Sequence, residues 1–315
     1  MPVALSAKLG GMGVNNSARF LITGASGPIG VALLPSLTAT GAQITRLVRH
    51  QPTGGGQMHW DPEQPLAPES VSGFDAVIHL AGESIMGRWT EAKKDKIRNS
   101  RVRGTQNLAQ ALARAAQKPR VLVAGSAIGF YGDRGDEILR EESRSGAGFL
   151  PKVCREWEMA SQPATDAGIR TVHIRTGVVL SPKGGALQQM LPPFKLGLGG
   201  RIGSGRQWFS WIHIDDMVGA IQHILKTDTV QGPVNMVAPK PVTNTEFTRV
   251  LASVLSRPAI LPVPTFALRL AFGSQMADEV LLASERVEPA KLNACGYAFH
   301  YTDLQPALTA LLKSR

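Results

Sequence analysis

The stretch FLITGASGPIG, residues 20–30, decides the fold, because a short apolar run leads directly into a glycine-rich turn. Its glycines are spaced as GxxGxxG and a helical pattern follows them. Such a turn lets backbone amides and a helix N-terminus face a pyrophosphate, while small residues let helix and strand approach closely. We therefore predict dinucleotide binding here, against the alternative of a purely structural tight turn. The predicted contacts are Gly24, Ser26, Gly27, Ile29 and Gly30, since Pro28 has no amide hydrogen to donate.

From Arg19 onward, short apolar runs alternate with helical patterns. Uninterrupted apolar strands separated by helices imply a parallel sheet covered on both faces. The predicted fold class is therefore α/β, with a doubly wound parallel-sheet Rossmann domain. The predicted strands are 20–23, 76–82, 121–125, 171–180 and 234–238, with 43–48 as a weaker one, and the predicted helices lie near 29–40, 91–116, 152–167 and 215–226.

The pattern changes in two places along the chain. Residues 181–210 are irregular and contain seven glycines. After about residue 239, a capping-box spacing from Thr243 to Glu246 opens a helix, and a proline-punctuated segment follows. We therefore predict a smaller, discontinuous α/β substrate lobe from 181–210 and 240–315, beside a Rossmann domain from 19–180 and 211–239. Residues 1–18 lack periodicity and are predicted to form a flexible leader.

Composition excludes several classes of protein. Of the 315 residues, 43% are hydrophobic and 18% are charged, which is typical of a globular protein. No apolar run approaches the ~20 residues that a membrane helix needs, so we expect no membrane partner. Cys154 and Cys295 lie far apart, which argues against a disulfide framework or a zinc ribbon and favours a reducing, cytoplasmic setting.

The formal net charge of +10 favours anionic partners such as phosphorylated small molecules. The densest basic stretch, residues 93–103, is interrupted by an acid and is followed by no aromatic residues that could stack on bases. We interpret it as a solvated helix face and expect no nucleic-acid partner. The HIDD sequence at 213–216 is interpreted as an aspartate cap at a helix start, and no spacing of His, Asp and Glu indicates a metal site.

Two arginines bear on the choice of dinucleotide. NAD-type folds place an acidic residue roughly 20 positions after the glycines, where it binds the ribose 2′-hydroxyl. Arg49 stands at that point, and no Asp or Glu lies between 31 and 60. An arginine can hold a 2′-phosphate, so we predict NADP(H), with a surface arginine as the alternative. Arg101 falls on the inward stripe of its helix, where cofactor binding and an internal salt bridge both remain open.

Seven stretches of the sequence carry a family resemblance. They are TGASGPIG (23–30), HLAGESI with GRWT (79–90), SRVRGTQNL (100–108), SAIGFYGDRGDE (126–137), RTGVVLSPKGGAL (175–187), LGLGGRIGSGRQWFSWIHIDD (196–216) and VAPKPVTNTEF (237–247). Together they resemble the atypical extended short-chain dehydrogenase/reductases, and among these the YfcH-type NAD-dependent epimerase/dehydratase proteins, which sometimes carry a SulA-like cell-division label. The similarity runs from about Arg19 to the end and includes that group's characteristic C-terminal domain.

The resemblance implies a Rossmann domain that binds NADP(H), with Arg49 on the side of the 2′-phosphate. It also implies that Leu80 and Ala81 lie over the adenosine half of the cofactor and that Val179 passes close to the nicotinamide. Arg101 matches a cofactor-contacting arginine of the family.

The usual catalytic pair of short-chain dehydrogenases is missing. These enzymes use a tyrosine as general acid/base and a lysine four residues later to lower its pKa. No YxxxK occurs here, and Leu150 and Cys154 occupy the two positions. Ser126 and Tyr131 are candidate substitutes, each with a structural alternative: a strand-end turn for Ser126 and a packed loop aromatic for Tyr131.

A second glycine-rich segment, residues 197–208, has no strand–helix frame around it. In extended family members the equivalent region covers the substrate, so Arg201 and Arg206 are candidates for binding an anionic group, against the alternative of a flexible surface hairpin. We expect Trp208, Phe209 and Trp211 to pack the two lobes together.

Two functions are consistent with these residues. One is an NADP(H)-dependent oxidoreductase or epimerase that acts, without YxxxK, on an unidentified small substrate, nucleotide-linked compounds included. The other is a catalytically silent NADP(H)-binding sensor or a regulatory, division-related interaction protein. We expect a monomer or homodimer in either case.

Overall fold

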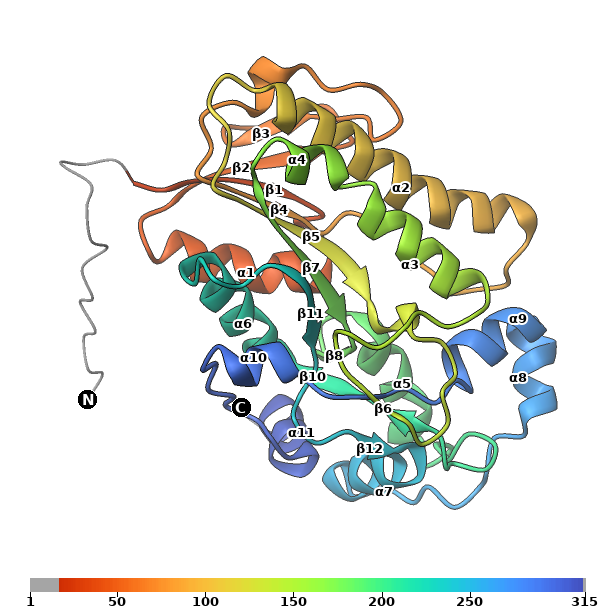
Figure 1. The fold of residues 1–315 in the computed structure, drawn as a ribbon. Helices are drawn as coiled ribbons and strands as arrows, with labels where there is room; N and C mark the ends of the chain where they lie inside the picture. The colour runs from red at the N-terminus through yellow and green to blue at the C-terminus, as the bar shows by residue number, and fades with distance from the viewer. Residues whose placement is uncertain (1–16, 314–315) are drawn as a thin grey trace, which may run out of the picture.

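A seven-stranded parallel sheet forms the centre of the computed structural model, which describes residues 17–313 (Figure 1). Its order is β11-β7-β5-β4-β1-β2-β3, and every neighbouring pair is parallel. The doubly wound α/β fold class is therefore confirmed. Apart from Ser17 and Ala18, the predicted leader lies outside the described residues. The strands are β1 (Arg19–Thr23), β2 (Gln43–Val48), β3 (Gln57–His59), β4 (Ala76–His79), β5 (Val121–Ala127), β7 (Arg170–Thr176) and β11 (Gly232–Met236).

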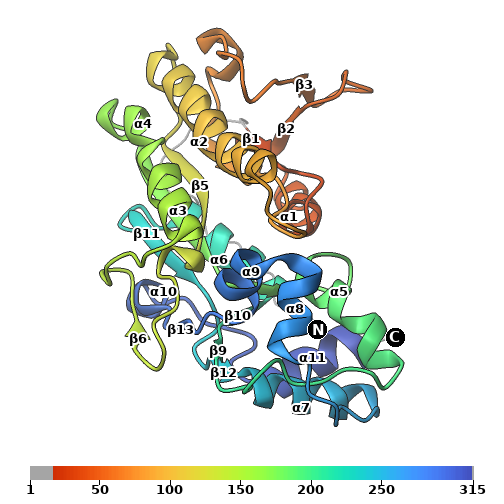
Figure 2. The ribbon, with the colours of Figure 1, turned by 90° about the vertical axis from the view of Figure 1, so that its right-hand side faces the viewer.

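Helices cover both faces of this sheet (Figure 2). Successive strand residues point to opposite faces, so Ile22 and Ile78 pack in one apolar cluster while Leu21 and Val77 pack in another. One face carries α1 (Pro28–Thr38) and α6 (Ile214–Lys226), and the other carries α2 (Glu91–Arg114), α3 (Phe149–Met159) and α4 (Gln162–Asp166). Short 3-10 helices, η1 (Pro68–Val71) and η2 (Ile128–Phe130), join these elements.

Two predicted elements are each divided in two. The helix expected over 152–167 is α3 followed by α4, because Pro163, near the start of α4, has no amide hydrogen to continue the helix. The strand expected over 171–180 is β7 followed by β8 (Val178–Leu180), which leaves the sheet and pairs with β10 (Trp211–His213). Gly177 permits this departure, because a Cβ there would lie 2.7 Å from the carbonyl oxygen of Ser210.

A second lobe lies below the sheet in both views. Thr243 caps α7 (Asn244–Leu255) by accepting a hydrogen bond from the Glu246 amide at 3.2 Å, in agreement with the predicted capping spacing. Trp211 is fully buried in the cluster that joins β8 to the second lobe. The remaining elements are β6 (Ile138–Leu139), α5 (Gly185–Lys195), β9 (Trp208–Phe209), β12 (Val242–Thr243), α7 (Asn244–Leu255), α8 (Thr265–Phe272), α9 (Ser274–Met276), the single π-type turn η3 (Ala277–Leu281), β13 (Arg286–Val287), α10 (Ala290–Ala294) and α11 (Leu304–Lys313).

Candidate functional site

A cleft of about 950 Å³ opens at the carboxyl ends of β1, β2 and β4. We call it the glycine-turn cleft. The strand order reverses between β1 and β4, which is where open α/β sheets bind their ligands. Of the predicted residues, six line the cleft directly: Gly24, Ser26, Gly27, Arg49, Leu80 and Ala81.

The glycines of the turn are required by close backbone approaches. Gly24 has a φ of +68°, and a Cβ on it would lie 2.6 Å from the carbonyl carbon of Leu80. A Cβ on Gly30 would lie 2.6 Å from the Gly24 oxygen. At the start of α1, Gly27 offers no side-chain cap, so the first-turn amides are available to a ligand. This cradle fits the pyrophosphate of a dinucleotide.

Cations gather at the far end of the cleft. Arg49 is exposed at the end of β2, and its side chain makes no hydrogen bond or ion pair with any residue from 17 to 313. Glu83 is the single acid among the described lining residues, and Lys93 holds it at 2.7 Å. Arg46 and His50 also line the cleft, and sequence reasoning missed them. The sequence could have indicated them, since both lie within three residues of Arg49 around the end of β2.

Arg101 lies beneath the cleft and not in its lining. Its Nη1 donates to the carbonyl oxygens of Glu83 at 2.9 Å and Ile97 at 3.1 Å, and the guanidinium lies over the Trp157 ring. A Cβ on Gly82 would lie 3.2 Å from the Arg101 Cζ. Arg101 therefore supports the 82–83 segment through carbonyl oxygens and forms no salt bridge with the described residues, whereas its contact with a cofactor stays a prediction.

A buried polar chain holds the adjoining segment. The hydroxyl of Thr23 lies 2.7 Å from His79 Nδ1 and accepts the Ala81 amide at 3.1 Å. His79 Nε2 lies 2.9 Å from the Thr105 hydroxyl. Burial lowers the pKa of His79 to about 4, so the ring is neutral. Leu80 and Ala81 are thus positioned by a network that periodicity alone did not indicate.

The other predicted cofactor residues lie outside the lining of this cleft. Gly30 is buried inside α1, and Ile29 packs against the apolar cluster under α1 and α6. Val179 on β8 packs against the same cluster, whereas its neighbour Val178 lines a second pocket.

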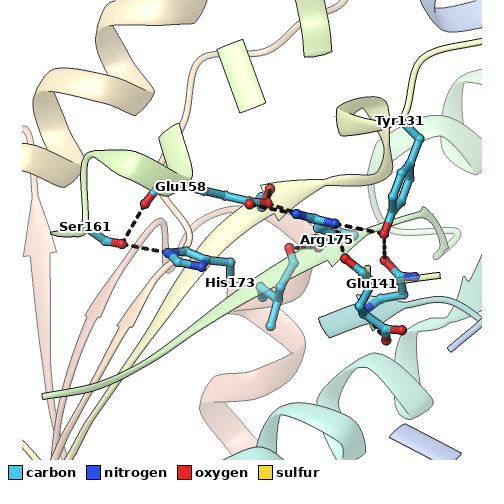
Figure 3. Close-up of polar contacts among 10 residues, drawn as sticks. Tyr131, Glu141, Glu158, Ser161, His173 and Arg175 are labelled. Carbon is cyan, nitrogen blue, oxygen red and sulfur yellow. Dashed lines mark hydrogen bonds and ion pairs between the residues drawn. The ribbon is translucent and has the colours of Figure 1, made fainter. Parts of the chain in front are cut away.

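Tyr131 belongs to a buried network around Arg175 (Figure 3), and Ser126 bonds to Glu158 of the same network. The Ser126 hydroxyl donates to Glu158 Oε1 at 2.7 Å. The Tyr131 hydroxyl donates to Asn235 Oδ1 at 2.7 Å and accepts from Arg175 Nη1 at 3.0 Å. Tyr131 is fully buried, and burial raises its pKa to about 12 although Arg175 opposes the shift. The placement of Tyr131 agrees with its structural alternative as a packed aromatic, whereas Ser126 lies within β5 and not in a turn.

At the position of the missing lysine, Cys154 is buried in α3. Burial raises the pKa of its thiol to about 12, and the charges of Glu158 and Glu285 act in the same direction. The thiol is therefore protonated at neutral pH and is a poor nucleophile.

A second pocket of about 360 Å³ lies between the sheet domain and the second lobe, and we call it the lobe pocket. Val178, Ile128 and Met86 line one part of it, and α5, α8, η3 and the segment 198–210 supply most of the rest. Trp208 and Phe209 contribute to the wall, so they do more than pack the lobes. Glu285, which sequence reasoning missed, is its single ionisable lining residue among those described.

Arg201 and Arg206 are both exposed and lie outside the lining of the lobe pocket. Arg201 Nη1 donates to the Gly203 carbonyl at 2.6 Å within its own loop. The loop is also tied to the second lobe by an isolated bridge between Ile202 and Val263. The loop is therefore anchored on one side, and its two arginines lie outside the lining.

The predicted aspartate cap at the start of α6 is wrong. His213 is the cap, and its Nδ1 accepts the Asp215 amide at 3.1 Å. Asp216 is fully buried and accepts hydrogen bonds from the Tyr297 hydroxyl and the amides of His300 and Tyr301. It therefore ties α6 to the C-terminal segment, a long-range role that a local motif does not reveal.

Residues 20–237 match the family described as NAD dependent epimerase/dehydratase. The chain belongs to this family. Residues 263–311 of the epimerase-family chain also match a domain of unknown function, DUF1731. The predicted resemblance, including its C-terminal domain, is therefore confirmed, and the chain is an epimerase-family protein of the short-chain dehydrogenase/reductase type.

Three relatives illustrate the similarity. The Mycobacterium bovis epimerase family protein Mb2239 is 42% identical over 294 residues, covering 93% of this chain and 97% of the relative. A crystal structure of the human epimerase family protein SDR39U1 with NADPH is 36% identical, covers 94% of this chain and all of the human chain, and has a TM-score of 0.87. A structure described as a nucleoside-diphosphate sugar epimerase from Corynebacterium glutamicum is 40% identical, covers 94% of this chain and 58% of that chain, and has a TM-score of 0.77.

Neither a membrane span nor a metal site emerges from the part of the epimerase-family chain that the structure describes. Within residues 17–313, no helix is long and apolar enough to cross a membrane. Over the same range, no group of three or more His, Cys, Asp and Glu residues is placed to hold a metal ion.

Proposed function

We propose that this chain binds NADP(H) in the glycine-turn cleft and transfers hydride to or from a small organic substrate in the lobe pocket, as an oxidoreductase or epimerase. The observation that carries the proposal is the cleft itself. It has a glycine cradle at one end and, at the other, the Arg49 side chain without a hydrogen-bond or ion-pair partner among the described residues. No acidic residue follows β2 where NAD-binding folds carry one. The human relative crystallised with NADPH supports the same cofactor.

Each predicted residue would have a distinct task in holding the cofactor. The free amides of the glycine turn, those of Ile29 and Gly30 among them, would receive the pyrophosphate, and Ser26 lies exposed beside them. Arg49 would hold the 2′-phosphate, and Leu80 and Ala81 would face the adenosine half. Arg101 would keep the 82–83 segment in place from beneath. We place the nicotinamide end near β8, where Val179 and Val178 lie side by side.

When bound, NADP(H) supplies or accepts a hydride at its nicotinamide. The protein's part is to orient the substrate and to exclude water, because electrostatic interactions strengthen in a dry site. The lobe pocket is suited to that part, since apolar side chains from both lobes enclose it.

The test is a calorimetric titration of the purified protein with NADPH and with NADH. We expect NADPH to bind at least tenfold more tightly, a difference of about 1.4 kcal/mol. Arg49→Glu should abolish this preference through charge repulsion. Arg103→Glu is the matched control, since Arg103 is an exposed arginine on α2 outside the cleft. Equal affinities for both cofactors in the wild type would contradict the proposal.

A second candidate function is a catalytically silent NADP(H)-binding sensor or a regulatory, division-related interaction protein. It is favoured by the missing YxxxK and by the use of the Ser126 and Tyr131 hydroxyls inside the fold. NADPH-dependent affinity for a protein partner, with no turnover in a broad substrate screen, would support this function over the first.

We also infer the setting in which the protein works. We assign cofactor binding to residues 19–180 and 211–239, and substrate binding to 181–210 and 240–315. The two separated cysteines favour a cytoplasmic location. We infer a monomer or homodimer. The interrupted basic stretch at 93–103 supports the absence of a nucleic-acid partner.

A further inference from the structure

The lobe pocket is lined mainly by apolar side chains. Met190 and Phe194 come from α5, Leu268 and Phe272 from α8, and Leu281 from η3. Its volume of about 360 Å³ lies near the lower end of the ~300–1,000 Å³ found for small-molecule sites. The pocket therefore offers a ligand apolar contact and little else over most of its surface.

Its few polar side chains are largely engaged by the protein. Asn244 Oδ1 accepts the Ile202 amide at 2.7 Å, and Gln207 Nε2 donates to the Ile202 carbonyl at 3.2 Å. The Ser210 hydroxyl donates to the Glu285 carbonyl at 2.7 Å. These bonds shape the wall and leave few donors for a ligand.

No lysine, arginine or histidine belongs to the lining, as far as the described chain shows. A pyrophosphate is normally held by such cations or by helix amides. The single ionisable lining group is a carboxyl, that of Glu285. An anionic ligand would thus meet an apolar wall and no cation.

The Glu285 carboxyl is unusual because it has no partner. Its Oε1 is buried and accepts no hydrogen bond, and its other oxygen appears in no hydrogen bond either. Burial, and to a smaller extent the charge of Asp133, raise the pKa of Glu285 to about 8. This carboxyl, when ionised, also raises the pKa of Cys154 on α3. The neighbouring Arg286 guanidinium lies over the Trp208 ring, 4.4 Å from its centroid. At neutral pH the group is a protonated carboxyl that can donate one hydrogen bond.

We propose that the lobe pocket binds an uncharged, mostly apolar compound whose carbonyl or hydroxyl oxygen accepts a hydrogen bond from Glu285, and that it does not bind a nucleoside diphosphate sugar. The inference rests on the proposed function, whose substrate class it names. It narrows the range of small substrates left open by the sequence, which included nucleotide-linked compounds.

The test uses the neutral fluorescent ketone prodan, whose emission shifts to the blue in an apolar site, on the full chain without added NADPH. We expect saturable binding at pH 6.5 that a neutral ketone such as 2-decanone displaces and UDP-glucose does not. Since a carboxylate cannot donate, affinity should weaken as the pH rises through about 8. Glu285→Gln should bind with no such pH dependence, and Glu285→Leu should bind roughly threefold to tenfold more weakly at pH 6.5.

Two matched pairs of variants locate the site. Leu198 and Leu196 are both exposed, 63% and 73%, but Leu198 lines the pocket and Leu196 does not. Leu198→Arg should therefore weaken prodan binding while Leu196→Arg leaves it unchanged. Glu288→Gln should keep the wild-type pH dependence, because Glu288 faces Arg140 outside the pocket.

Displacement of prodan by UDP-glucose, indifference to Leu198→Arg, or an unchanged pH dependence in Glu285→Gln would each overturn the inference. A parallel NADPH titration of the same preparations separates the two proposals. Tight NADPH binding together with any of these results would leave the cofactor function standing and remove the substrate class alone.

Discussion

Arg175 on β7 holds the carboxylate of Glu158 on α3 by two hydrogen bonds, Nε to Oε1 at 2.8 Å and Nη2 to Oε2 at 2.9 Å.. Both side chains are buried, with 4% and 13% of their surface exposed. Glu158 also accepts the Ser126 hydroxyl, and Arg175 also donates to Tyr131. One ion pair thus joins α3 to β5 and β7. The same helix carries Leu150 and Cys154, which occupy the two positions of the usual catalytic pair.

Replacing one partner of this pair should destabilise the fold strongly. Arg175→Met leaves the Glu158 carboxylate buried without its cation, which costs about 3–5 kcal/mol. Urea unfolding followed by circular dichroism measures the loss. Lys240→Met is the control, since its pair with Asp303 is 62% and 54% exposed and should contribute less than about 1 kcal/mol. Similar losses for both variants would show that the buried pair has no special role.

Tyr131→Phe separates a structural tyrosine from a catalytic one. The change leaves Asn235 Oδ1 without its donor in a buried site, so we expect a loss of about 1–3 kcal/mol in the free energy of unfolding. NADPH affinity should stay unchanged, because Tyr131 lines neither the cleft nor the pocket. A fold of unaltered stability would instead favour Tyr131 as a functional hydroxyl.

Gly30→Ala adds a single methyl group, but we expect it to disturb the glycine turn strongly. The added Cβ would lie 2.6 Å from both the Gly24 oxygen and the Ala25 Cα, and backbone atoms cannot move aside as a flexible side chain can. We expect NADPH binding to weaken at least about tenfold and stability to fall by about 1–3 kcal/mol. Gly54→Ala meets open space and serves as the control, with both quantities unchanged. Wild-type affinity in Gly30→Ala would mean that the turn is not tightly packed.

The features that could be predicted from the sequence are those that depend on near neighbours. The turn from Gly24 to Gly30, the apolar strands and the capping spacing at Thr243 each lie within one short segment. Arg49 follows its strand directly, so its position could be counted. These local patterns were enough to place the cleft at the correct edge of the sheet.

The features that could not be predicted depend on distant contacts. The break at Gly177 is required by Ser210, far along the chain, and the role of Asp216 depends on the C-terminal segment. Glu285 follows a serine and precedes an arginine, a context typical of a surface loop. Its Oε1 is nevertheless buried in the wall of the lobe pocket, beside segments far away in the chain.

The buried Glu285 carboxyl should make stability depend on pH in a defined window. Its pKa is about 8 in the folded chain and 4.5 as its ordinary value, so between these values the folded state binds more protons than the unfolded state. Stability from this group is present at low pH and is lost as the pH rises through about 8, at up to about 1.4 kcal/mol per pH unit.

The range from pH 6.5 to 8 isolates this effect best. Burial also lowers the pKa of His79 to about 4, but that group affects stability only below its ordinary value of 6.5. Burial raises the pKa of Cys154 from 9.0, so the thiol acts only at higher pH. Urea unfolding at several pH values should therefore show Glu285→Gln gaining stability relative to the wild type from pH 6.5 to 8. Parallel curves for the two proteins would mean that the carboxyl is ionised and solvated in the folded chain.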